Sequence, residues 1–186
     1  MNVIAISKKP SDNIGMFDQD ELIRLGATES HLQFARFLSD QKGGALFVDY
    51  QKLDLMRIPK LVPDIWVLDF RQGIDGGLLL HFSGSRIDGK YGEPITNKRV
   101  EDIYSGHFGE QILDALRKVH LEKCGVFFTR NDFFERSGSQ LVRRIVAVNY
   151  PCSSDGENVD FGIGLTTFEE TKQQELDEPI ISILSS

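Results

Sequence analysis

The chain has 186 residues, of which 40% are hydrophobic, and its formal net charge is -7. This size indicates one compact domain, and an acidic chain repels phosphate backbones, so no nucleic acid is expected as a partner. Its apolar runs are far shorter than the roughly 20 residues of a membrane span, and it has only two cysteines, so we expect a cytoplasmic protein with reduced thiols and no membrane contact.

Two helices are predicted near the start of the chain. The first follows a capping-box pattern that begins at Asp18. The second is capped by Ser30 and ends at a pair of glycines. It carries an apolar stripe at helical spacing, formed by Phe34, Phe37 and Leu38. This amphipathic helix is expected to cover an apolar surface.

A hairpin of two strands follows, over residues 65 to 70 and 78 to 84. Both strands are apolar on both faces, which predicts that both faces of the sheet are covered. The N-terminal helix is the expected cover for one face. The segment from residue 84 to 104 is rich in glycine and polar residues, and it is the expected cover for the other. We expect this segment to form an irregular wall that leaves a cavity over the sheet.

The rest of the chain predicts one long helix and three strands. The helix spans residues 107 to 125, where apolar residues recur three or four positions apart. The strands span residues 125 to 137, 139 to 151 and 159 to 169, separated by turn signals. Helices that separate groups of strands are typical of an α+β fold, and we expect a five-stranded antiparallel sheet.

Three stretches together resemble the PAS domain, in the form of the small stand-alone alphaproteobacterial PAS-type family. They read "LVPDIWVLDF", "LLLHFSGSRIDGKYGEPITNKRVEDIY" and "VNYPCSSDGENVDFGIG". The resemblance covers roughly residues 45 to 168, which leaves 1 to 44 as an N-terminal helical extension and 169 to 186 as a C-terminal tail. The family often has Arg where His81 stands and a second Gly at positions 95 to 96, so roles tied to those positions do not carry over.

The resemblance implies a sensory or interaction module without enzymatic activity. Its sheet and helices would enclose a pocket for a small-molecule ligand, and it would form a homodimer through the N-terminal helix. Because no kinase or cyclase segment is recognised, the output would pass through the dimer or a separate signalling protein.

Polar residues in the second strand and in the wall are candidate ligand contacts. Strand alternation places His81 and Ser83 on one face, where a buried His must find either a ligand or a backbone carbonyl. Arg86 is suited to a ligand carboxylate, and it is equally suited to an ion pair with Asp88 or Glu93.

Further candidates come from the wall and from the three C-terminal strands, whose inward residues are expected to share one face. Arg143 and Arg144 alternate along their strand, so at most one of them points inward. The predicted ligand-binding residues are His81, Ser83, Arg86, Tyr91, Phe127, Thr129 and Arg143.

The sequence identifies no cofactor and no metal site. Flavin photochemistry in PAS relatives needs a Cys that "SGSRIDGKYG" lacks, and haem would need a His on the long helix, where His107 and His120 lie. The four His have no metal-ligand spacing. Two other functions stay open: a small enzyme on a cone-like α+β fold that uses His81 and Asp69 as an acid/base pair, and a ligand-free interaction scaffold with a core filled by Phe.

Overall fold

The computed structural model describes residues 5–7, 16–104, 106–136, 139–171 and 180–184. The helices are α1 (Gln19–Arg24), α2 (Glu29–Lys42), α3 (Ser85–Tyr91), α4 (Val100–Ile103) and α5 (Gly106–Leu121), with 3-10 turns η1 (Tyr50–Lys52), η2 (Leu55–Arg57) and η3 (Val62–Asp64). The strands are β1 (Ala5–Ser7), β2 (Val48–Asp49), β3 (Ile65–Asp69), β4 (Leu79–Ser83), β5 (Gly125–Arg136), β6 (Ser139–Ser153), β7 (Phe161–Thr171) and β8 (Ile180–Leu184). These elements confirm the α+β class.

The sheet is larger than the five strands expected from the sequence. Its order is β1-β8-β5-β6-β7-β3-β4, and β2 pairs with β6 outside this path. The pairs β1–β8 and β2–β6 are parallel, and the others are antiparallel. The extra strand β8 is a short apolar run that pairs with β5 along Gly125 to Thr129, where it covers an otherwise free sheet edge.

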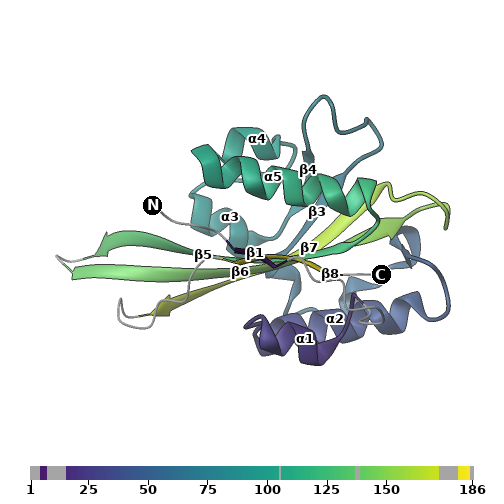
Figure 1. Cartoon of the computed structure of the whole chain (residues 1–186), viewed down its shortest axis with the longest axis horizontal. Helices are drawn as coiled ribbons and strands as arrows, with labels where there is room; N and C mark the ends of the chain where they lie inside the picture. The colour runs from purple at the N-terminus through teal and green to yellow at the C-terminus, as the bar shows by residue number, and fades with distance from the viewer. Residues whose placement is uncertain (1–4, 8–15, 105, 137–138, 172–179, 185–186) are drawn as a thin grey trace.

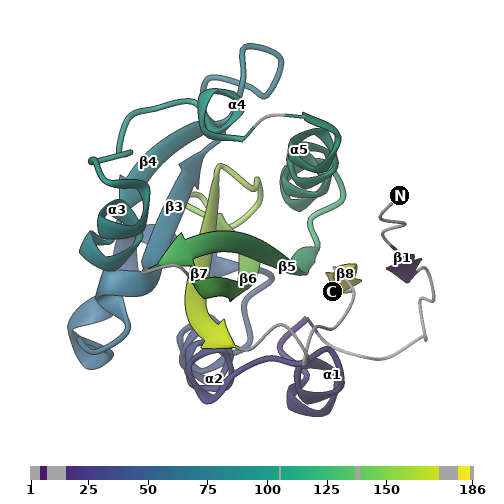
Figure 2. The same ribbon diagram turned by 90° about the vertical axis from the view of Figure 1, so that its left-hand side faces the viewer.

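Helices cover both faces of the sheet, as the apolar strands predicted. Helices α1 and α2 lie on one face, and α3, α4 and α5 lie on the other (Figures 1 and 2). The apolar stripe of α2 packs against the sheet of its own chain, where Phe34 and Leu38 are fully buried beside Ile65 and Val148. Within the described residues, no helix combines the length and the apolarity needed to cross a bilayer.

Helix α2 begins two residues earlier than predicted, with Thr28 rather than Ser30 as its N-cap. His31 takes the place that Glu or Gln occupies in a capping box: its Nδ1 accepts from the backbone N–H of Thr28 at 3.2 Å. Its Nε2 donates to the carbonyl of Val146 at 3.1 Å. Because the ring is buried, the pKa of His31 is lowered to about 4, and the imidazole is neutral at pH 7.

A β-bulge in β4 changes which side chains share a face. Leu80 lies opposite Leu68 and Phe82 lies opposite Val67, so His81 is the extra residue between them. The ring of His81 lies 5.9 Å from that of Phe161, which belongs to the core under α1 and α2. Ser83 lies opposite Trp66, on the face under α3 to α5. The simple alternation that placed His81 and Ser83 together is therefore wrong, because the extra residue shifts the register by one.

Candidate functional site

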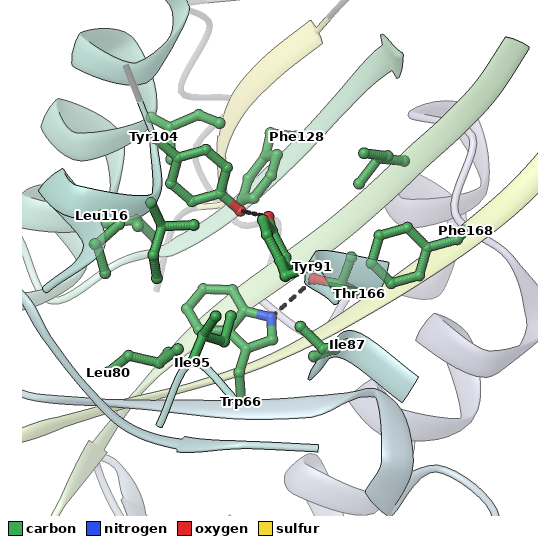
Figure 3. Close-up of a pocket in the computed structure, with 14 residues that line it drawn as sticks. Trp66, Leu80, Ile87, Tyr91, Ile95, Tyr104, Leu116, Phe128, Thr166 and Phe168 are labelled. Carbon is green, nitrogen blue, oxygen red and sulfur yellow. Dashed lines mark hydrogen bonds between the residues drawn. The ribbon is translucent and has the colours of Figure 1, made fainter. Parts of the chain in front are cut away.

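A cavity of about 40 Å³ lies between the sheet and helices α3, α4 and α5 (Figure 3). The side chains that line it come from β3, β4, β5, β6 and β7 and from all three helices. They are Trp66, Leu80, Ile87, Tyr91, Ile95, Val100, Ile103, Tyr104, Ile112, Leu116, Phe128, Ile145, Thr166 and Phe168. This is the position where the sequence predicted a cavity, under the wall formed by residues 84 to 104.

Trp66 forms one wall of the cavity, and β7 is shaped to receive its ring. The indole lies so close over Gly164 that any side chain there would overlap it. The indole N–H donates to the hydroxyl of Thr166 at 2.9 Å, which fixes the ring along β7 (Figure 3). A Cβ at a second glycine, Gly162, would lie 2.6 Å from Oδ1 of Asn149 and 3.2 Å from the ring of Phe70. The Gly-x-Gly spacing on β7 thus allows two aromatic rings to approach the strand closely.

Two tyrosines from the wall segment, residues 84 to 104, contact each other inside the cavity. Tyr91 ends α3 and Tyr104 follows α4, and their hydroxyl groups form a hydrogen bond of 3.0 Å (Figure 3). Burial raises the pKa of Tyr91 well above its ordinary value, so this phenol stays protonated at neutral pH. The guanidinium of Arg130 lies over the Tyr104 ring, 5.3 Å from its centroid.

The chemistry of this lining suits binding better than catalysis. The described side chains around the cavity are uncharged at neutral pH, and their polar atoms are two phenols, one hydroxyl and one indole N–H. Such groups orient a ligand by hydrogen bonds, whereas acid–base chemistry needs a group that titrates near the working pH. An apolar lining with a few hydrogen-bonding atoms has the composition, though at about 40 Å³ not the size, of a typical small-molecule site.

Of the predicted ligand-binding residues, Tyr91 lines this cavity. Ser83 is buried on the correct face but lies outside the lining, and its Oγ has no hydrogen-bond partner among the described residues. His81 lies on the other side of the sheet, against Phe161. Arg86 also lies outside the lining, where it forms an ion pair with the buried carboxylate of Asp64 rather than with Asp88 or Glu93.

The three candidates on β5 and β6 do not share a face. Phe127 pairs with Val148, and both are buried in the core under α1 and α2. Thr129 lies two residues further along β5, so its side chain points to the same face as Phe127, and it is also buried. Arg143 pairs with Asp132, and by strand alternation both point to the opposite face, which is the face of Phe128 and Ile145 in the cavity lining. The predicted grouping failed because adjacent phenylalanines give no sign of which one faces inward.

The alternative acid/base pair, His81 with Asp69, lies near the end of the β3–β4 hairpin. Both oxygens of Asp69 accept hydrogen bonds from Arg71: its backbone N–H at 2.9 Å, Nε at 3.0 Å and Nη2 at 2.7 Å. These bonds lower the pKa of Asp69 below its ordinary value. A carboxylate held in this way is a poor proton acceptor.

The histidines considered for haem have other surroundings. Nδ1 of His120 donates to the carbonyl of Val159 at 2.6 Å, and its ring packs against Phe70. The side chain of His107 lies outside the described part of the structure. Among the described residues, no group of three or more His, Cys, Asp or Glu side chains is arranged to hold a metal ion.

Sequence reasoning missed most of the cavity. Trp66, Thr166 and Phe168 were assigned to strands, but no role was given to them. A signal was present: the glycines at positions 162 and 164 alternate with apolar residues in a predicted strand, which indicates that a large ring approaches the backbone. Comparison with known proteins adds no assignment to this geometry: no protein-family model matches the chain, and no match was found among the curated proteins.

Proposed function

We propose that this chain is a non-enzymatic sensory or regulatory module of the PAS type, which binds a small ligand in the cavity between the sheet and α3 to α5. The observation that carries the proposal is the cavity itself, an apolar space with a phenolic hydrogen-bonding pair, Tyr91 and Tyr104, inside it. The resemblance of the sequence implied a pocket in this position.

The strands that line the cavity also offer a route from ligand to output. Trp66 faces the cavity, while its neighbours Ile65 and Val67 pack in the core under α1 and α2. A ligand that favours one position of the Trp66 ring would favour one position of β3 against α2. Only a ligand with different affinities for two states shifts such an equilibrium, so this is a population-shift mechanism.

A homodimer through the N-terminal helices is part of the proposal, with a changed contact surface. The apolar stripe of α2 is already buried in its own chain, so a dimer would use the outward side of this region. Ile23 on α1 is 56% exposed there. A separate signalling protein is the other candidate receiver for the output, and it would meet the same outward side.

The enzyme alternative has less support, because Arg71 occupies the Asp69 carboxylate. The ligand-free scaffold differs from the sensor only in the use of the cavity. Native mass spectrometry of the purified full chain separates the two, since a retained small molecule adds mass. Leu116→Phe fills the cavity, and Leu121→Phe on the exposed side of the same helix is the matched control.

We expect added mass in the wild-type chain and in Leu121→Phe, and its loss in Leu116→Phe. If all three proteins carry the mass of the chain alone, the scaffold function is correct instead. If Leu116→Phe retains the molecule, the molecule binds somewhere other than the cavity.

A further inference from the structure

We propose that the ligand of this cavity is a small, uncharged, branched apolar molecule with one carbonyl oxygen, and that the Tyr91–Tyr104 pair binds that oxygen. The inference rests on the proposed function, because it names the ligand class for the same cavity. It follows from the number of hydrogens in the pair, from the charges around it and from the size of the cavity.

The two phenols have one more O–H hydrogen than their shared hydrogen bond uses. Each phenol has a single O–H hydrogen, and the bond between Tyr91 and Tyr104 uses one of the two. As placed, Tyr91 donates and Tyr104 accepts, and the Tyr104 hydroxyl donates to no other described group. Whichever phenol donates, one O–H remains for an acceptor inside a cavity whose walls are mainly apolar (Figure 3). A ligand with an acceptor oxygen satisfies this hydrogen, whereas a hydrocarbon leaves it unpaired.

The charges around the pair favour a neutral carbonyl over a carboxylate. Two cations lie over lining rings: Arg130 over Tyr104, with its Nη2 paired with Asp132 at 3.1 Å, and Lys90 over Phe168, with its Nζ 5.7 Å from the ring centroid. Neither cation belongs to the lining, whose described residues are uncharged at neutral pH, so an anion among them would lose its hydration without a cation of the lining to bind it. Burial also holds the Tyr91 phenol in its protonated form, which donates a hydrogen bond rather than accepting a proton.

The size and shape of the cavity limit the apolar part of the ligand. Its volume of about 40 Å³ is well below the ~150 Å³ of an engineered cavity that binds benzene, so a molecule of six heavy atoms enters only when the lining moves. Branched side chains dominate its lining, among them Ile87, Ile95, Ile103 and Ile145. Tyr91 is partly exposed at the end of α3, so a small movement of its ring would admit a compact branched molecule.

Three probes of one branched shape test the inference: 3-methyl-2-butanone, 2,3-dimethyl-1-butene and isobutyrate. The first has a neutral carbonyl, the second has no acceptor, and the third is an anion. Trp66 is the only tryptophan in the sequence and it lines the cavity, so its fluorescence reports binding there. Each probe is titrated into the wild-type chain, Tyr91→Phe, Tyr104→Phe and the double variant.

The hydrogen count predicts an unusual pattern. Either single variant removes the internal bond but still leaves one free O–H, so the ketone keeps its preference over the alkene, about tenfold, as in the wild type. The double variant has no phenol left, and both neutral probes should bind it equally. Isobutyrate should bind the wild type more weakly than the ketone. Equal binding of ketone and alkene in the wild type, a preference that survives in the double variant, or tighter binding of isobutyrate would each overturn the inference.

The outcomes also separate this inference from the proposed function. If the alkene binds as well as the ketone, the cavity takes ligands but the carbonyl assignment fails. If no probe changes Trp66 fluorescence in the folded wild-type chain, the proposed function itself fails. If the double variant does not fold, the infrared C=O stretch of the ketone bound to the wild type decides the matter. A stretch below its value in hexane supports the phenol bond, and an unchanged stretch refutes it.

Discussion

Replacing Gly164 by Ala tests whether the flat packing of Trp66 on β7 maintains the cavity wall. A methyl group at this position would overlap Cε2 and Cζ2 of the indole and would lie 2.7 Å from the carbonyl oxygen of Val148. The backbone of β6 or β7 must shift to relieve the contact with the carbonyl, and the indole must also move. That movement would break the hydrogen bond from Trp66 to Thr166.

The cost has two parts and one offset. Forcing an extra methyl into a packed core costs about 1–3 kcal/mol. Losing the indole hydrogen bond adds about 0.5–1.5 kcal/mol. Replacing a strand Gly by Ala recovers about 0.5–1 kcal/mol of backbone entropy. We therefore expect Gly164→Ala to lower the free energy of unfolding by about 2 kcal/mol and to shift the Trp66 emission to longer wavelength, because the ring becomes more exposed.

Chemical denaturation followed by far-UV circular dichroism measures the loss, and tryptophan fluorescence measures the displacement. Gly89→Ala in α3 is the matched control, because a methyl there meets no heavy atom within 4 Å. The control should be neutral or slightly stabilising. A Gly164→Ala protein with wild-type stability and an unchanged emission spectrum would refute the packing described for Trp66.

Three further changes follow from buried polar groups. His31 has a pKa of about 4 in the folded chain and about 6.5 when unfolded, so protons favour the unfolded state as the pH falls. The free energy of unfolding should drop by about 3 kcal/mol between pH 6.5 and pH 4. Denaturation of a His31→Gln variant should lack this part of the pH dependence. Arg71→Ala should lower the free energy of unfolding by about 1–3 kcal/mol at pH 7. The loss should shrink as the pH falls below 4, because the lowered pKa of Asp69 stabilises the fold only while the carboxylate is charged. Thermal unfolding at pH 7 and below pH 4 checks this. Asn149 is fully buried, and neither atom of its side-chain amide has a hydrogen-bond partner among the described residues. Asn149→Val should therefore raise the free energy of unfolding by about 1–2 kcal/mol. A lower free energy of unfolding in this variant would show that the amide is paired in solution.

The layers of the fold were predictable because they follow from apolar periodicity. Strands that are apolar on both sides require two covers, and the helical stripes before and after them supply those covers. The glycine-rich segment between β4 and α5 could be identified as the cavity wall, because it is too irregular to fill the space above the sheet. Tyr91 was found as a lining residue by its place in that segment.

The individual faces were less predictable, because single-residue shifts decide them. The bulge in β4 adds one residue and turns His81 away from the cavity, and nothing in "LLLHFS" marks it. Phe127 and Phe128 are chemically identical neighbours, and the register of β5 against β6 places Phe128 on the face with the cavity. The ion pair of Arg86 with Asp64 joins positions 22 apart, so local spacing pointed to nearer carboxylates instead.

The most direct test of ligand binding in the cavity is methyl NMR on the full chain with labelled isoleucines, recorded as 3-methyl-2-butanone is added. Isoleucines line the cavity on several elements, and others lie buried on the opposite face of the sheet. Binding in the cavity predicts the largest shifts for Ile95, Ile112 and Ile145, with smaller shifts for Ile58 and Ile163 in the core through which β3 contacts α2. Unchanged spectra, or shifts confined to Ile58 and Ile163, would contradict the account.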